Sequence, residues 1–93
     1  MWKTISVTTG ARVQFLDITA QVRAEVAQSG VKNGICYVFV PHTTAGITIN
    51  ENADPDVVRD LTVALARIVP EHGDYHHSEG NSDAHLKASF MGF

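Results

Sequence analysis

The chain has 93 residues, of which 44% are apolar and 18% are charged, and its net charge is −3 with histidine neutral. This is an ordinary globular composition, which argues against intrinsic disorder and favours one domain over residues 1–93. The acidic balance argues against a nucleic-acid partner. The N-terminus has no apolar run long enough for a signal peptide or a membrane span, so we expect a cytoplasmic protein without a membrane partner.

The first third of the sequence predicts two strands and a helix. Polar and apolar residues alternate over residues 3–8 and again over residues 12–15, which is typical of paired strands. Asp17 or Thr19 can cap the N-terminus of a following helix, and Gly30 can end it in the left-handed conformation. The apolar stripe of this helix consists of Ile18, Val22 and Val26.

Two further strands are predicted in the middle of the chain. Residues 35–40 are apolar on both faces, which favours a central strand, and Cys36 within it is expected to be a small buried apolar side chain. Pro41 ends this strand. After a short polar segment, residues 47–50 alternate again and predict another strand.

The clearest helix signal follows Asp54. This residue is a good N-cap, and Pro55 suits the first helical position because its absent N–H would have no helical partner there. Pro70 closes the helix. Its apolar stripe consists of Val57, Leu61, Leu65 and Ile68.

A last short helix is expected to begin near Ser82 or Asp83 and to run toward Phe90. The order of elements indicates an α+β fold, a single domain with an antiparallel β-sheet and packed helices. A sheet of about four strands leaves an edge or a face open. Either another chain covers it, or further strands belong to the complete protein.

Histidines gather near the end of the chain. Of the five, four fall between His72 and His85. The same stretch contains three carboxylates, those of Asp74, Glu79 and Asp83. Imidazoles with carboxylates suit a divalent ion such as zinc, and the loop between His77 and His85 can aim both rings at one point. The residues alone leave a metal site and a solvated polar loop as alternatives.

The segment His42–Gly46 lies between two predicted strands. Its glycine lets backbone N–H groups approach an anion, and the hydroxyls of Thr43 and Thr44 add donors. His42 can act as a metal ligand or as a general acid or base. An ordinary capped turn remains the alternative.

Three charged side chains near this segment could also serve a site. Glu51 has no structural explanation in the pattern, and it could hold a substrate amine, orient a histidine or ligate a metal. Lys87 and Arg59 are the nearby cations for a phosphate. Each of these two also fits a plain surface role.

Three blocks in order make the sequence resemble the YjbQ-type family, also known as the secondary thiamine-phosphate synthase family. The blocks are VFVPHTTA (38–45), INENADPDV (49–57) and HSEGNSDAHLKAS (77–89). The resemblance implies an α+β domain on an antiparallel sheet, assembled as a homotrimer, with a pocket near the subunit boundaries. It also implies a divalent metal ion, zinc or magnesium, bound through histidines.

Matching the blocks residue by residue assigns the site. The expected metal ligands are His42, His77 and His85, with His77 taken rather than His76. The expected catalytic residues are His42, Glu51 and Asp83. The expected substrate- or anion-binding residues are Thr43, Thr44, Asn52, Asn81 and Lys87. His72 and His76 are expected to be surface residues.

The activity that the resemblance implies joins a pyrimidine diphosphate to a thiazole phosphate, which forms thiamine phosphate and releases pyrophosphate. Two alternatives use the same residues: a metal-dependent hydrolase of a phosphorylated metabolite, and a non-enzymatic trimeric module that binds a metal or an anion. Family members continue past the position of Phe93 with further strands. We therefore expect this chain to be C-terminally truncated relative to the family, with an incomplete sheet and pocket wall.

Overall fold

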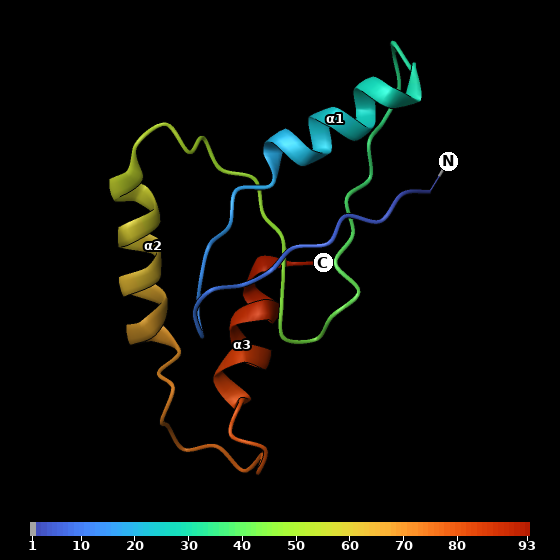
Figure 1. Ribbon diagram of the computed structural model, residues 1–93. Coiled ribbons are helices and arrows are strands. Elements are labelled where there is room, and N and C mark those ends of the chain that lie inside the picture. Colours follow the sequence, from blue (N-terminus) through green and yellow to red (C-terminus); the bar gives the residue numbers. More distant parts are fainter. Residues whose placement is uncertain (1) are drawn as a thin grey trace. The chain divides into compact units, whose positions relative to one another are not determined.

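The computed structural model describes residues 2–93, and this part of the chain contains three helices (Figure 1). They are α1 (Thr19–Ser29), α2 (Pro55–Ile68) and α3 (Ser82–Met91). The chain forms two compact units, Met1–Tyr37 with α1 and Val38–Phe93 with α2 and α3. No helix within residues 2–93 is long and apolar enough to cross a membrane.

The predicted antiparallel sheet is wrong, because residues 2–93 contain no β-strand (Figure 1). Alternation decides which side chains would share a face of a strand, but a strand also needs a partner segment to complete its hydrogen bonds. In the second unit, the backbone N–H groups of Val40 and Ile47 donate instead to the carbonyls of Phe93 and Gly92, at 2.9 and 3.1 Å. Two of the predicted strand segments are thus tied to the end of α3.

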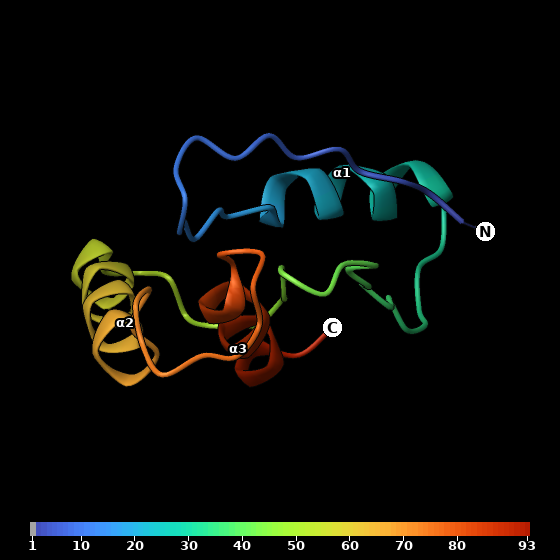
Figure 2. The same ribbon diagram turned by 90° about the horizontal axis from the view of Figure 1, so that it is seen from below.

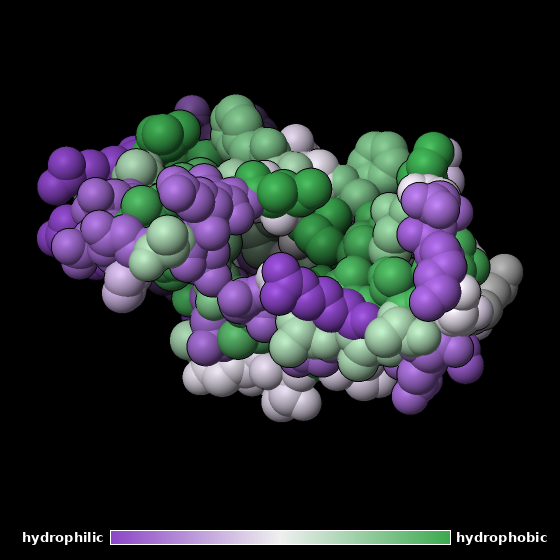
Figure 3. All heavy atoms as spheres, turned by 90° about the horizontal axis from the view of Figure 1, so that it is seen from above, coloured by the Kyte–Doolittle hydropathy of each residue, from purple (hydrophilic) through white to green (hydrophobic). Residues whose placement is uncertain are grey.

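Many large apolar side chains are exposed to solvent. Figure 3 shows apolar residues, in green, at the surface of one face. Val69 is the one buried apolar residue in the part of the chain that the structure describes. The expectation that residues 35–40 form a buried central strand is also wrong: Tyr37 is 86% exposed and Cys36 is exposed. Without a sheet, most of this apolar run is exposed, and its end, at Phe39 and Val40, contacts Phe93.

Helix α1 begins and ends close to its predicted limits, but the predicted N-cap at Asp17 or Thr19 is wrong: the N-cap residue is Ile18, and it makes no side-chain cap hydrogen bond. The side chain of Asp17 accepts a hydrogen bond from the N–H of Thr19 at 2.9 Å, just before the helix. At the other end, Gly30 takes the left-handed conformation with φ 74°, and its N–H donates to the carbonyl of Ala27. A residue with a Cβ is strained at this φ, which explains why glycine ends the helix.

Helix α2 confirms the capping prediction. The carboxylate of Asp54 accepts a hydrogen bond from the N–H of Asp56 at 2.9 Å, and Pro55 is the first helical residue. Asp56 in the first turn and Arg67 in the last turn both complement the helix dipole. Local chemistry therefore sets both ends of this helix.

Replacing Asp54 by alanine should lower the free energy of unfolding by about 1 kcal/mol, the usual cost of losing an N-cap. Urea denaturation followed by far-UV circular dichroism measures this loss. Asp60→Ala is the matched control, since Asp60 lies on the exposed face of the same helix. Equal losses in the two variants would show that the cap contributes nothing.

The C-terminal end of helix α3 packs against residues 39–47, which come before α2 in the same unit. A Cβ added to Gly46 would lie 2.7 Å from the carbonyl oxygen of Gly92 and from the Cβ of Met91. The rings of Phe39 and Phe93 meet edge to face, with centroids 6.1 Å apart. Figure 2 shows the connection from α2 to α3, and this connection contains the histidine-rich residues.

Candidate functional site

The candidate site lies where the histidine-rich segment enters α3. The hydroxyl of Ser82 donates to the carbonyl of His77 at 3.5 Å, and the N–H groups of Ala84 and His85 donate to the carbonyl of Asn81 at 3.1 and 3.3 Å. The bond from Ser82 ties the segment to the first residue of α3, and the other two bonds form the first turn of that helix. His77 before the helix and His85 within it are brought together as a result.

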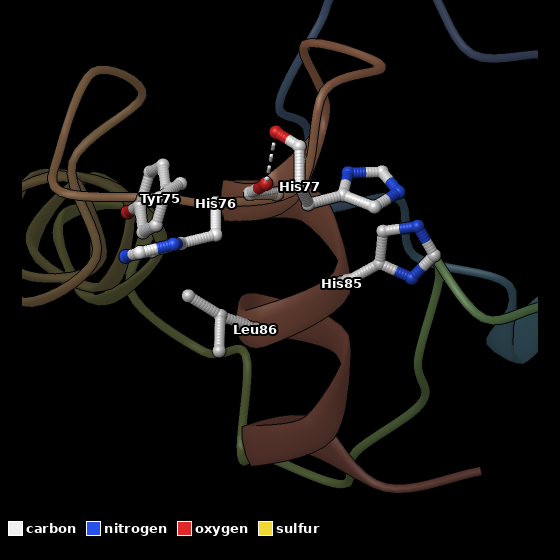
Figure 4. A pocket seen from close by; sticks show the side chains of 6 residues that line it. Tyr75, His76, His77, His85 and Leu86 are labelled. Atoms are coloured by element: carbon white, nitrogen blue, oxygen red, sulfur yellow. Dashed lines mark hydrogen bonds between the residues drawn. The ribbon is translucent and has the colours of Figure 1, made fainter.

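The rings of His77 and His85 form an edge-to-face pair (Figure 4). Their centroids are 5.2 Å apart and their planes are inclined by 73°. A carboxylate oxygen of Glu79 lies 4.0 Å from Nε2 of His77, and both of these side chains are substantially exposed. The His77–His85 pair is therefore open to a ligand arriving from solvent.

A pocket of about 320 Å³ opens beside this pair. It is lined by Tyr75, His76, His77, Ser82, His85 and Leu86. Figure 4 shows His77 and His85 on one side of the start of α3, and Tyr75, His76 and Leu86 on the other. This volume is at the lower end of the range for small-molecule sites.

Of the three predicted metal ligands, the structure brings two together. No group of three or more His, Cys, Asp or Glu side chains able to hold a metal ion occurs among residues 2–93, so His42 does not join His77 and His85. His42, Thr43 and Thr44 are all exposed. The three-histidine ligand set remains a prediction.

Asp83 and Lys87 occupy a different environment from the histidines. Their side chains are 1% and 12% exposed, and Nζ of Lys87 lies 3.2 Å from a carboxylate oxygen of Asp83. They sit four residues apart on α3, a spacing that places them on the same helix face. The pair accounts structurally for both residues, whose predicted catalytic and anion-binding roles remain predictions.

The remaining predicted site residues lie outside the pocket lining. Glu51 is exposed, and Asn52 takes a left-handed conformation with φ 53°, which asparagine tolerates better than most residues. Asn81 precedes α3, and its side-chain Oδ1 is buried without a hydrogen-bond partner. Gly46 packs against the end of α3, which gives this residue of the predicted anion loop a packing role.

Sequence reasoning missed Tyr75, His76, Ser82 and Leu86 as lining residues, and it read Ser82 only as a possible start of the helix. His76 was expected at the surface, and it is exposed, but it also lines the pocket. The run Tyr75-His76-His77 was the available signal, because it places an aromatic ring and two imidazoles immediately before the predicted helix. Leu86 gave no signal beyond that of an ordinary helical leucine.

Comparison with known proteins places these features in a family. The model of the family described as UPF0047 protein YjbQ-like matches residues 3–93. The UPF0047 protein MJ1081 of Methanocaldococcus jannaschii is 49% identical over 84 residues, which cover 90% of this chain and 61% of that protein. The UPF0047 protein YugU of Bacillus subtilis is 45% identical over 93 residues, which cover 99% of this chain and 70% of that protein.

A crystal structure of an uncharacterized conserved protein of the YjbQ/UPF0047 family from Clostridium acetobutylicum is also similar. It is 59% identical with a TM-score of 0.89, and the match covers 92% of this chain and 67% of that one. The match to the Methanocaldococcus relative spans 61% of the length of that protein. The matches in sequence and in backbone agree with the three motif blocks, and the chain belongs to the YjbQ-like UPF0047 family.

Proposed function

We propose that the pocket binds a divalent metal ion and a phosphorylated small molecule, and that the protein is a transferase of the thiamine-phosphate synthase type. The observation that carries the proposal is the pairing of His77 with His85 at the mouth of the pocket. Two imidazole rings side by side gain little from each other in water. They are well placed to share a cation.

The separation of the two rings supports zinc as the proposed ion. Zinc–nitrogen bonds of about 2.0–2.1 Å and a tetrahedral angle place two coordinating imidazole centroids about 5 Å apart. The centroids of His77 and His85 are 5.2 Å apart. Imidazole nitrogen also favours zinc over magnesium, which prefers oxygen ligands and retained water.

Transfer from a diphosphate requires stabilisation of the negative charge on the leaving group. A bound divalent ion would supply positive charge at that point. The hydroxyl of Ser82 lines the same pocket, and Glu79 lies beside His77, where it can orient that ring. The proposal keeps His42 as a third ligand and Thr43 and Thr44 as anion donors. None of these three residues lines the pocket in a single copy of the chain, so the His42–Gly46 segment would have to move toward it.

The proposal includes a homotrimer. Large apolar side chains such as Ile35, Tyr37 and Ile49 are exposed in a single copy. Monomeric proteins rarely leave many such side chains uncovered, and contact between copies would bury them. Light scattering on purified protein measures the mass, and a monomer at working concentration contradicts the trimer.

Purified wild type should contain near-stoichiometric zinc, and His77→Ala should bind zinc about tenfold or more weakly. Metal analysis and competition with a chromogenic chelator measure both quantities. His72→Ala is the matched control, because His72 is 93% exposed and does not line the pocket. Equal zinc content in the wild type and in both variants would reject His77 as a ligand.

Activity is tested with the same three proteins. Formation of thiamine phosphate from the pyrimidine diphosphate and the thiazole phosphate, lost in His77→Ala and kept in His72→Ala, is the expected result. Hydrolysis of a phosphoester panel without any thiazole partner would favour a metal-dependent hydrolase instead. Ligand binding without turnover would favour a binding module.

A further inference from the structure

One dipeptide of the sequence lies outside the candidate site and carries chemistry of its own. Asparagine occurs at four positions, and only Asn33 is followed by glycine. The Asn33–Gly34 pair lies in the connection that leads from the end of α1 at Ser29 to the second unit, which begins at Val38 (Figure 1). An asparagine side chain is an amide, and the backbone nitrogen of the next residue can attack it when nothing hinders the approach.

Hydrogen bonds hold this connection only as far as Val31. The hydroxyl of Ser29 donates to the carbonyl of Val26 at 2.6 Å and accepts from the N–H of Val31 at 3.2 Å. Beyond this point, residues 32–34 are exposed and belong to no helix. The N–H of Gly34 donates no hydrogen bond to any other residue that the structure describes. This backbone nitrogen is therefore not held in place by an acceptor.

The usual structural role of an Asn-Gly pair is not filled here. The pair is favoured at the two central positions of a type I′ turn, where both residues need a positive φ. Asn52 is the one non-glycine residue with a positive φ in the described part of the chain, so Asn33 does not take this conformation. Gly34 has φ 159°, which is also outside the range of such a turn. The pair is thus not locked in a turn that would keep the two reacting atoms apart.

We propose that Asn33 is a site of spontaneous covalent modification, at which the side-chain amide is lost and the residue becomes aspartate or isoaspartate. The backbone nitrogen of Gly34 forms a bond to Cγ of Asn33, and the side-chain nitrogen leaves as ammonia with the proton of the Gly34 N–H. Water then adds to either carbonyl of the resulting cyclic imide and breaks its bond to the ring nitrogen. The net change consumes one water molecule, releases one ammonia molecule and involves no oxidation or reduction.

The residue after the asparagine decides how readily this attack occurs. Glycine has no Cβ to obstruct the close approach of its backbone, whereas each of the other three asparagines is followed by a residue with a side chain. The product adds one negative charge to the net charge of −3. In the isoaspartate form, the backbone runs through the side-chain carbon and becomes one atom longer between α1 and the second unit. The site is independent of the histidine pocket.

Ageing of the purified full chain near neutral pH tests the proposal. Peptide mapping by mass spectrometry at successive times gives the deamidated fraction at each asparagine, and an isoaspartate-specific methyltransferase labels the isoaspartate product. Asn50, Asn52 and Asn81 are internal controls in the same samples. The variants are Gly34→Ala and Asn33→Gln, of which the second leaves the glycine and its φ of 159° in place.

We expect the wild type to lose the amide of Asn33 about tenfold or more faster than that of any other asparagine, with the isoaspartate label at the same residue. Gly34→Ala should slow the change at Asn33 by about the same factor. Asn33→Gln should not form the more acidic species on ageing, because its longer side chain must close a larger and less favourable ring. Equal rates at all four asparagines, or an unchanged rate at Asn33 in Gly34→Ala, overturns the assignment. So does an acidic species that forms in Asn33→Gln at the rate of the wild type.

Discussion

Replacing Asp83 by alanine should lower the free energy of unfolding by about 3–5 kcal/mol, the cost of removing one partner from a buried ion pair. Asp83 is the most deeply buried side chain in the described part of the chain, and the ammonium of Lys87 lies 3.2 Å from it. Without the carboxylate, that ammonium stays largely out of solvent with its ion pair broken. Urea denaturation followed by far-UV circular dichroism measures the loss.

The chain carries its own control for this experiment. Arg59 and Asp60 also form an ion pair, at 3.0 Å, but their side chains are 71% and 69% exposed. Asp60→Ala should change the free energy of unfolding by no more than about 0.5 kcal/mol, because water screens an exposed pair. If the Asp83→Ala variant fails to fold, Lys87→Met removes the other partner of the same ion pair, whose side chain is less buried. Similar small losses of unfolding free energy at both ion pairs would show that burial does not make the Asp83–Lys87 pair more important for stability.

The helices were predictable from sequence because their ends depend on nearby residues. Asp54 and Pro55 begin α2, and Gly30 ends α1 in the left-handed conformation that glycine favours. The predicted start of α3 at Ser82 or Asp83 is also confirmed. Each of these signals acts over one helical turn, so it can be recognised without knowing the rest of the fold.

The strands could not be predicted in the same way. Alternation over residues 3–8 and 12–15 fixes a pattern of side chains, but a sheet forms only when another extended segment completes the hydrogen bonds. The partners that Val40 and Ile47 find are carbonyls at the end of α3, more than forty residues along the chain from either of them. Nothing in the local sequence specifies that pairing.

The site was predictable in part. The density of histidines near residue 80 indicated a candidate region, and the structure places His77 and His85 side by side there, while their role as ligands stays a prediction. Which other residues line the pocket depends on how the loop folds over α3, and this is why Tyr75 and Leu86 were missed. A pattern of residue types indicates which chemistry a site could carry more readily than it indicates which other residues line the pocket.

Replacing Gly46 by alanine should lower the free energy of unfolding by about 3 kcal/mol, at the upper end of the usual cost of overpacking. The added Cβ would meet the carbonyl oxygen of Gly92 at 2.7 Å and that of Ala88 at 3.1 Å. These are backbone atoms, so a side-chain rotation cannot relieve the clash, and the segment must move away from the end of α3. The hydrogen bond from the N–H of Ile47 to Gly92 would be disturbed by the same movement.

Gly10→Ala is the matched control for this substitution. A Cβ at Gly10 would meet only side-chain atoms of Gln14, at 3.7 Å or more, so the stability of Gly10→Ala should stay within about 1 kcal/mol of the wild type.

Zinc affinity measured on a folded Gly46→Ala protein adds a second result. Because His77 and His85 pair at the other end of α3, the zinc ion proposed for them should still bind if the close approach of Gly46 serves packing alone. A stability equal to that of Gly10→Ala would contradict the packing role. A loss of zinc at unchanged stability would instead connect the His42–Gly46 segment to the metal, as the motif predicts.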